Sequence, residues 1–445
     1  MKNLFGILVV FIALAVSYYG EFNIGIGITL VLIISSLLAM KKGNSLDEIV
    51  KIAYLKGKKS FLVIQIFFLV GIVSSLWINS GTIPGIVYYG IKFMNPSYFY
   101  VLAFFISSAA SFLLGSSLGT AGTIGIAIIA VGRGIGVDPN IAGGAILSGV
   151  YFGDRCSPVS SSANLIATLT ETNLYTNIKN MFRTGTIPFL LTAFLYNLLA
   201  EKESVILQEN PLIQQIQENF TITPLVFLPV MVILICAIFK INVKISMLAS
   251  IVMAIIIGKF IQNYSFLDFM RSIILGFTLN RDVPLALIIK GGGLISVWKA
   301  CLTVFISCSL SGVIEKLEIL NNFDKVLMSI KSRGKIFLST LIVSLVTAAL
   351  GCNQSIAVVM TNEIMGKIYE KKEIPKEELA IDIENTGIVV SALIPWNIAG
   401  MIPATMMGLS GLSYIGYSFY LYLIPLVSFV TYAVKSKNKI IEFQE

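Results

Sequence analysis

The sequence predicts an all-α, polytopic membrane protein with about 10–12 transmembrane helices. Of its 445 residues, 56% are hydrophobic and only 13% are charged, whereas a soluble domain carries roughly 25% charged residues. Apolar runs recur along the whole chain, and most approach the ~20 residues that a helix needs to cross a bilayer. Because backbone groups find no water in hydrocarbon, these segments must be helical. Two further stretches, 147–165 and 379–400, place ionisable side chains in apolar surroundings.

The apolar runs give the expected helices in order. They are Leu4–Tyr19, Ile24–Met40, Phe61–Ile78, Tyr98–Leu114, Ile187–Ala200, Pro224–Phe239, Ile245–Ile261, Leu294–Leu310, Ile336–Leu350 and Tyr414–Val434. The first run follows Lys2 and contains the small residues Ala13 and Ala15, a pattern that a cleaved secretion signal would also show. In a polytopic protein we expect an uncleaved first helix.

The formal net charge of +8 arises largely from short connections between apolar runs. These basic positions are Lys41, Lys42, Lys51, Lys56, Lys58 and Lys59, and after the last span Lys435, Lys437 and Lys439. Lysines in short loops stay on the cytoplasmic side. We therefore expect a multi-pass protein of the cell membrane with both termini in the cytoplasm, and no nucleic-acid partner. The connection Glu201–Phe220 holds four glutamates and one lysine, which favours the outside.

The chain divides into two halves with related polar breaks. The expected parts are an N-terminal half over 1–200, an acidic connection over 201–222 and a C-terminal half over 223–445. Gly115 and Gly351 are 236 residues apart, and Pro158 and Pro395 are 237 residues apart. This spacing favours internal repeats with transport segments at about 115–165 and 351–400. Chance is the alternative, since glycine and proline are frequent in membrane helices.

Residues that the chain lacks exclude several kinds of chemistry. It has no histidine, and its five cysteines have neither a disulfide framework nor metal-ligand spacing. No P-loop sequence occurs, and a serine–histidine hydrolase is not possible. We therefore expect a transporter and not an enzyme, with no cofactor and with sodium ions and protons as coupling ions. Protons must then move on carboxylates.

The break at Gly115 places hydroxyls on one helical face. Ser116, Thr120 and Thr123 are spaced i, i+4 and i+7. Glycines on the adjacent face would allow close helix packing. Alternatively, they open the helix so that hydroxyls and backbone carbonyls surround a cation. Both interpretations can hold together.

Asp154 is the clearest candidate in the first half. Ionisable groups at membrane depth are costly and mark ion or substrate paths. Ser157 is close enough to add an oxygen ligand, while Arg155 points about 100° away on a helix and need not pair with Asp154. The alternative is that Asp154 marks a helix end near the lipid head groups.

The second half repeats this pattern around Glu384. Glu384 and Ser391 are seven residues apart and would share a helical face. Asp382 is expected either on another face or at the interface, as a continuation of the charged loop before it. Lys290 precedes three glycines and would snorkel to an interface or compensate a buried acid.

Several motifs resemble the NhaC-type sodium/proton antiporter family over most of the chain. They are WINSGTIPGIVYYGIKFMNPSYF (Trp77–Phe99), GSSLGTAGTIGIAI (Gly115–Ile128), SGVYFGDRCSPVSSSANL (Ser148–Leu165), KGGG (Lys290–Gly293) and ENTGIVVSALIPWNIAG (Glu384–Gly400). The resemblance implies two inverted repeats with re-entrant hairpins and broken helices, alternating access, and coupling without ATP. It also implies family members that exchange organic acids such as malate for lactate.

The resemblance implies an ion or substrate site between the hairpin tips and the broken helices. The candidate residues are Ser116, Ser117, Thr120, Thr123, Asp154, Ser157, Ser160, Ser161, Asn164, Asn353, Gln354, Ser355, Glu384, Asn385, Thr386, Ser391 and Asn397. We expect Asp154 and Glu384 to carry protons and to bind sodium. The expected partners are the lipid bilayer, small ions or a small organic solute, and a second copy in a homodimer.

The chain departs from the family pattern at positions that matter for charge. Ser161 and Asn385 stand where the pattern has acids, and Ile388 replaces a threonine. Less negative charge weakens a simple cation-for-proton exchanger. It favours the alternative, a sodium- or proton-coupled transporter of a small organic acid or amino acid on the same fold, whose carboxylate would meet the positive ends of half-helices.

Overall fold

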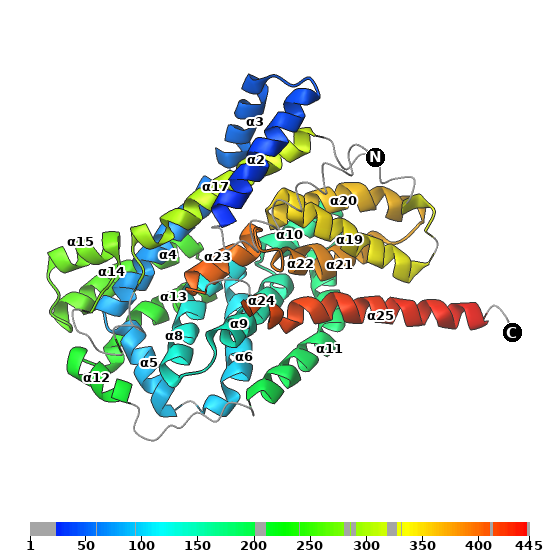
Figure 1. Cartoon of the computed structure of the whole chain (residues 1–445). Helices are drawn as coiled ribbons and strands as arrows, with labels where there is room; N and C mark the ends of the chain where they lie inside the picture. The colour runs from blue at the N-terminus through cyan, green and yellow to red at the C-terminus, as the bar shows by residue number, and fades with distance from the viewer. Residues whose placement is uncertain are drawn as a thin grey trace.

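The computed structural model describes residues 24–58, 60–93, 95–200, 211–239, 241–279, 285, 291–317, 327–330, 332–409 and 413–442. Within these ranges the chain is almost entirely helical, as predicted (Figure 1). Four helices are long and apolar enough to cross a membrane: Pro96–Leu114, Ser117–Ile135, Leu294–Ile314 and Arg333–Gly351. Two further pairs meet the same test as bent spans, with bends of 67° and 96°. The Lys290 expectation lies outside the described residues.

The first bent pair consists of α4 (Phe61–Asn79) and α5 (Thr82–Phe93). The second bent pair joins α12 (Pro211–Asn219) to α13 (Leu228–Ile238). Helices α14 (Val243–Phe260) and α15 (Phe266–Leu275) pack against α4. The break in α4–α5 falls at Gly81, whose φ of +76° is a conformation that glycine adopts easily. These helices form the part of the molecule on the left of Figure 1.

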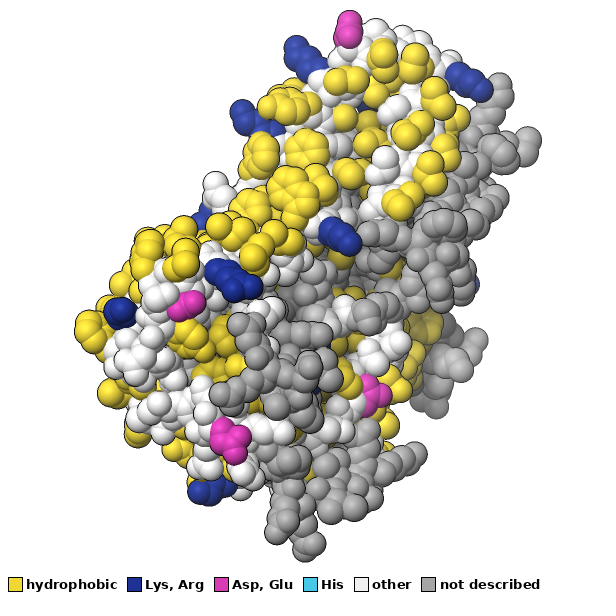
Figure 2. Space-filling model, turned by 60° about the vertical axis from the view of Figure 1, so that its left-hand side comes forward, with side chains coloured by type: hydrophobic (Ala, Val, Ile, Leu, Met, Phe, Trp, Pro, Cys, Tyr) yellow, Lys and Arg dark blue, Asp and Glu magenta, His cyan; other side chains and the backbone are white. Residues whose placement is uncertain are grey.

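Helix α17 (Leu294–Lys316) runs diagonally across the molecule and packs against α2 (Ile24–Lys41) and α3 (Leu46–Lys58) (Figure 1). Its outward face is apolar: Ile295 is 60% exposed and Trp298 is 55% exposed. Figure 2 shows hydrophobic side chains along this side of the molecule, with Lys and Arg at intervals. A continuous apolar exterior is what a protein in contact with lipid presents.

Five consecutive elements of the first half recur in the same order in the second half. In the first half they are α6 (Phe99–Leu114), α7 (Ser117–Thr120) continued by a π-helical turn and α8 (Ile126–Ile135), α9 (Pro139–Cys156), α10 (Ser161–Leu169) and α11 (Leu174–Ala200). In the second half they are α19 (Arg333–Gly351), α20 (Gln354–Lys371), α21 (Lys376–Ile383) continued by a π-helical turn and α22 (Val389–Ser391), α23 (Ile398–Met406) and α25 (Phe419–Glu442). The bounds of α10 and α23 differ by 237 at both ends.

The densest packing in the molecule joins α6 to α9. Two glycines make it possible. A Cβ on Gly149 would lie 2.5 Å from the Phe104 carbonyl oxygen, and one on Gly153 would lie 2.5 Å from the Ser108 carbonyl oxygen. Small residues let membrane helices approach until their backbones touch. This contact fixes the end of α9, where Asp154 lies.

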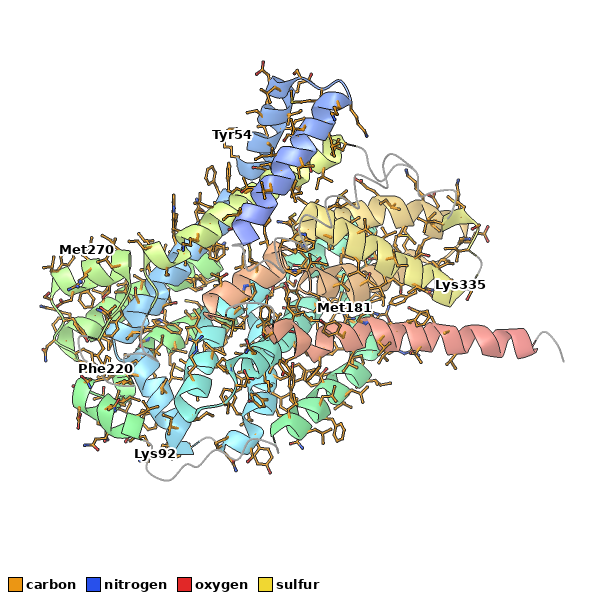
Figure 3. The ribbon with its side chains drawn as sticks, viewed as in Figure 1. Tyr54, Lys92, Met181, Phe220, Met270 and Lys335 are labelled. Atoms are coloured by element: carbon orange, nitrogen blue, oxygen red, sulfur yellow. The ribbon has the colours of Figure 1, made fainter. Side chains whose placement is uncertain are left out.

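The side chains at the centre of the molecule are buried in protein. Met181 of α11 is 0% exposed and lies among the central helices, whereas Lys92 and Lys335 lie at the periphery (Figure 3). The two halves meet in this central region through hydrogen bonds such as that from the Tyr151 hydroxyl to the Ala399 carbonyl oxygen, at 2.8 Å.

Candidate functional site

The first-half break is built by a left-handed residue followed by a cap. Helix α6 ends at Gly115, whose φ is +61°, a conformation that glycine adopts at little cost. Ser116 is extended and its hydroxyl accepts from the Gly119 N–H at 3.1 Å. Helix α7 then begins at Ser117, and the π-helical turn Ala121–Gly125 follows it. The Ser116 side chain therefore satisfies one of the backbone N–H groups that the start of α7 leaves free.

Asp154 lies where this break meets the end of α9. It is 4% exposed. The Ser160 hydroxyl donates to Asp154 Oδ1 at 2.8 Å, and Ser117 faces the same carboxylate with its hydroxyl and its backbone N–H. Asp154 is thus near a helix end, and its side chain is surrounded by protein. Ser157 directs its hydroxyl to the Phe112 carbonyl oxygen at 2.6 Å.

Arg155 is fully buried and joins four elements. Its Nη1 donates to the Tyr420 hydroxyl of α25 at 2.8 Å. Its Nη2 donates to Thr184 Oγ1 of α11 at 3.1 Å and also to Asn385 Oδ1. Its Nε has no hydrogen-bond partner. As expected, Arg155 makes no ion pair with Asp154, but its central position was missed; its charge inside an apolar stretch was the available signal.

Glu384 is the other buried acid of the site. It begins the π-helical turn Glu384–Ile388 that follows α21 and is 0% exposed. Neither of its carboxylate oxygens has a hydrogen-bond partner. The charges of Arg155 and Asp154 act on it electrostatically. The structure therefore brings the two predicted acids, one from each half, into the same buried region.

The second-half break repeats the construction of the first. Helix α19 ends before Cys352, whose φ is +52°. Asn353 is extended and caps α20 by accepting from the Ser355 N–H at 2.8 Å. Asn397 caps α23, accepting from the Ala399 N–H at 3.0 Å, and donates to the Ala348 carbonyl oxygen at 2.8 Å. Asn353 and Asn397 thus occupy the cap positions that Ser116 and Ser160 hold in the first half.

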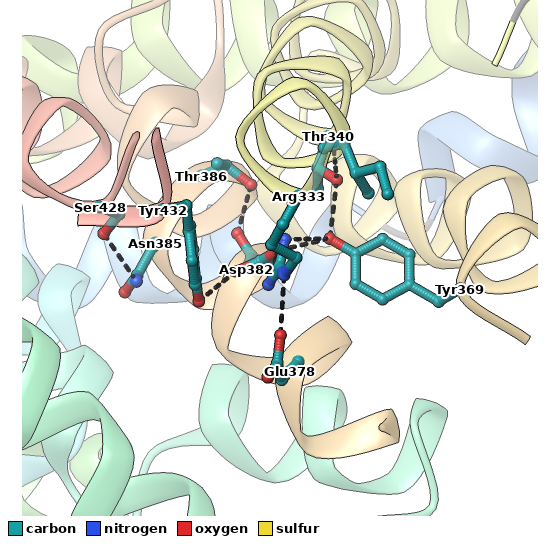
Figure 4. A network of polar contacts seen from close by, with 10 residues as sticks. Arg333, Thr340, Tyr369, Glu378, Asp382, Asn385, Thr386, Ser428 and Tyr432 are labelled. Atoms are coloured by element: carbon teal, nitrogen blue, oxygen red, sulfur yellow. Dashed lines mark hydrogen bonds and ion pairs between the residues drawn. The ribbon is translucent and has the colours of Figure 1, made fainter. Parts of the chain in front are cut away.

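Asp382 corrects one of two alternative expectations. As a continuation of the charged loop it would be exposed, but it is 0% exposed. It forms an ion pair with Arg333 of α19 at 2.7 Å and accepts hydrogen bonds from Tyr369 and from Tyr432 (Figure 4). Asp382 and Arg333 are 49 residues apart in the chain, so no local sequence pattern predicts that they pair.

The predicted site residues separate by burial. Those that are buried are Ser117, Thr120, Thr123, Asp154, Ser157, Ser160, Glu384, Asn385, Thr386, Ser391 and Asn397. Ser116, Asn353 and Gln354 are partly buried, and Ser161, Asn164 and Ser355 are exposed. Asn164 donates to the Ser160 carbonyl oxygen at 2.6 Å, and Gln354 to the Ile388 carbonyl oxygen at 3.3 Å.

Several buried hydroxyls are already engaged within their own helices. Thr120 Oγ1 donates to the Ser116 carbonyl oxygen at 2.8 Å, and Thr123 Oγ1 to the Gly119 carbonyl oxygen at 2.7 Å. Ser391 Oγ donates to the Gly387 carbonyl oxygen at 2.6 Å, and Thr386 Oγ1 to the Asp382 carbonyl oxygen at 2.6 Å. A hydroxyl that donates to the backbone keeps a lone pair as an acceptor. These groups can therefore still offer oxygen to a cation.

An apolar exterior, broken helices and two buried acids where the two halves meet are features of a multi-pass membrane transporter. The model of the Na+/H+ antiporter family matches residues 149–436. The chain belongs to this family.

Relatives within the family differ in what their names say they exchange. The chain is 29% identical to the malate-2H(+)/Na(+)-lactate antiporter of Bacillus subtilis, over 92% of this chain and 90% of the relative. It is 30% identical to the Na(+)/H(+) antiporter NhaC of the same organism, over 82% of this chain and 83% of the relative. It is also 30% identical to the arginine/ornithine antiporter ArcD of Halobacterium salinarum, over 78% of this chain and 73% of the relative.

Proposed function

We propose that this protein is a secondary active Na+/H+ antiporter in which Asp154 and Glu384 bind the sodium ion and carry the proton. The observation behind this proposal is Glu384, a fully buried carboxylate whose two oxygens have no hydrogen-bond partner. A desolvated carboxylate without a partner is strongly unfavourable when charged. A bound proton or a bound cation removes that penalty, and the two compete for the same oxygens. Such competition is what couples the two ions.

Asp154 differs from Glu384 in its surroundings. The hydroxyl donors Ser160 and Ser117 face its carboxylate, and such donors favour the charged form. We infer that Asp154 provides the standing negative charge at which sodium docks, and that Glu384 alternates between proton and sodium. Backbone carbonyls and hydroxyls at the breaks would complete the set of oxygen ligands. No cofactor is required.

Transport would proceed by alternating access between two inverted repeats. The 237-residue offset shared by both ends of α10 and α23 supports the repeat, and the Tyr151–Ala399 hydrogen bond marks a contact that links the halves. The location would be the plasma membrane with both termini in the cytoplasm, in line with the lysine-rich short connection and C-terminal tail. A homodimer is the assembly we propose.

A second candidate is exchange of a small organic acid or amino acid. The observation that favours it is Arg155, a buried guanidinium whose side-chain partners are neutral: Tyr420, Thr184 and Asn385. Its Nε has no partner. An arginine without a carboxylate at hydrogen-bond distance can bind the carboxylate of a solute. The names of the malate/lactate and arginine/ornithine relatives support the same alternative.

Proteoliposomes loaded with a pH-sensitive dye test the proposal. An outward sodium gradient should drive proton entry in the wild type, and Asp154→Asn should abolish it while the purified protein keeps its Tm. Asp268→Asn, an exposed acid that caps α15, is the matched control and should transport normally. Uptake of malate, lactate, arginine and ornithine, measured in parallel, distinguishes the second candidate. Absence of sodium-driven proton flux in the wild type would remove the first candidate.

A further inference from the structure

Glu384 lies between two residues that are each held by an arginine, Arg333 partly buried and Arg155 fully buried. On its N-terminal side, Asp382 pairs with Arg333 of α19 at 2.7 Å. On its C-terminal side, Asn385 accepts from Arg155 of α9. The π-helical turn that carries Glu384 is therefore fixed from two directions, while Glu384 itself has no hydrogen-bond partner.

Hydrogen bonds and ion pairs around Arg333 form a connected polar network (Figure 4). Arg333 Nε donates to Glu378 at 2.7 Å, and the guanidinium lies 4.0 Å from the centre of the Tyr432 ring. The Tyr432 hydroxyl donates to Asp382 Oδ1 at 3.1 Å, and the Tyr369 hydroxyl donates to Oδ2. The members come from α19, α20, α21 and α25, the helices around the Glu384 turn.

The network is also joined to that turn through the backbone. Thr386 donates to the Asp382 carbonyl oxygen at 2.6 Å, and a second hydrogen bond joins its hydroxyl to that of Ser344 of α19 at 3.0 Å. Any displacement of Asp382 would therefore move the residues on either side of Glu384.

Stability alone is a poor reason for this ion pair. Taking two charges out of water costs about as much as their attraction returns, and apolar side chains of similar size often serve as well. A charge pair beside an unpartnered acid has a second effect, because it sets the local potential. Asp382 is two residues from Glu384, and the positive charge of Arg333 compensates the negative charge of Asp382.

We propose that Arg333 and Asp382 are positioning residues that hold the Glu384 turn and set the affinity of the site for sodium. This inference rests on the proposed function. The other titratable or charged groups that face Glu384 are Asp154, Arg155 and Cys156 on α9 and Tyr420 on α25. On α20, Glu363 and Lys367 are exposed. The Arg333–Asp382 pair joins α19 to the helix that carries Glu384, with Asp382 two residues before it.

The test is the KM for sodium, measured at one fixed pH in proteoliposomes. Asp382→Asn leaves Arg333 without its buried partner, and the added positive potential should raise the KM about threefold to tenfold. The double variant Arg333→Gln with Asp382→Asn removes both charges and should return the KM to within about twofold of wild type. Glu370→Gln, an exposed acid on α20, is the control and should leave the KM unchanged.

Glu378→Gln is a variant that the fold tolerates easily, because the Glu378 side chain is 46% exposed. It also removes negative charge from Arg333, at a greater distance from Glu384 and with more screening by salt. Its KM should rise about twofold. This variant decides the matter if Asp382→Asn does not fold: a raised KM supports the inference, and an unchanged KM overturns it.

A lower maximal rate of Asp382→Asn with an unchanged KM would overturn the inference, since that result describes a purely structural pair. A double variant with a KM no better than that of Asp382→Asn would overturn it as well. A wild-type protein without sodium-dependent transport would overturn the proposed function itself. The two failures are therefore distinguishable.

Discussion

Arg155 donates a hydrogen bond to Asn385, a residue 230 positions further along the chain. Arg155 comes from the first half and Asn385 from the second, so this bond is a direct polar link between them at the level of the two buried acids. Both side chains are 0% exposed. The pairing of a guanidinium with an amide leaves a net positive charge next to Glu384, and this arrangement leads to the first two predictions.

Glu384→Gln should abolish sodium-driven proton movement, because an amide can neither release a proton nor compensate a cation. The protein should fold normally, since the buried carboxylate makes no hydrogen bond that would be lost. Dye-loaded proteoliposomes measure the flux. Glu363→Gln, on the exposed side of α20, should keep the wild-type rate. Full activity of Glu384→Gln would exclude Glu384 from the coupling mechanism.

Asn385→Asp should give Arg155 a charged partner in place of a neutral one. If Arg155 binds the carboxylate of an organic solute, uptake of that solute should fall at least tenfold, because charged hydrogen bonds of this kind contribute about 1.5–3 kcal/mol. Sodium/proton exchange should persist or increase. Asn362→Asp, at a half-buried position of α20, also adds a carboxylate and serves as the control. Equal solute uptake by wild type and Asn385→Asp would speak against a solute role for Arg155.

Gly153→Ala should destabilise the protein by about 1–3 kcal/mol or more, the usual cost of overpacking. The added Cβ would lie 2.5 Å from the Phe112 nitrogen and the Ser108 carbonyl oxygen, so α9 would have to move away from α6. The Tm in detergent measures the effect. Gly416→Ala, where a Cβ meets nothing within 4 Å, should leave the Tm unchanged. Comparable Tm values for the two variants would mean that the α6–α9 contact is looser than described.

The ion pair between Glu171 and Lys376 lies outside the membrane-spanning segments and should matter little. Lys376 lowers the pKa of Glu171 by donating a hydrogen bond to it and by its charge. A lowered pKa stabilises the folded state above the ordinary value of Glu, and this contribution disappears as the pH falls. Glu171→Gln should therefore shift the Tm by at most about 1 °C at pH 7, and the shift should shrink as the pH falls below about 4.3, the ordinary pKa of Glu. A difference that grows in acid would contradict this account.

The sequence was sufficient for the class of fold and for the two acids. Low charge and recurring apolar runs predicted the helical membrane protein, and polar groups within apolar runs pointed to Asp154 and Glu384. The helix breaks lie where glycine and proline spacing put them, because these residues act locally. The ion-binding roles of these residues and the half boundaries at 201 and 223 stay predictions.

Other parts of the site could not be read from spacing. Glu384 and Ser391 would share a face in an α-helix, but the π-helical turn Glu384–Ile388 changes the periodicity between them. The burial of Asp382 depends on Arg333, Tyr369 and Tyr432, which approach from other helices. Spacing describes one helix at a time, whereas these outcomes depend on its neighbours.

The caps at the four helix breaks have a consequence for the empty carrier. Each of these helices begins with a side-chain cap that accepts a backbone hydrogen bond, from Ser116, Ser160, Asn353 or Asn397. These backbone hydrogen bonds do not require a bound ion. The carboxylate oxygens of Glu384, by contrast, have no hydrogen-bond partner in the protein. A carrier with a charged and unoccupied Glu384 should therefore resist the change between its two access states. This single side chain would thus limit slippage, in which the ion gradient dissipates without exchange.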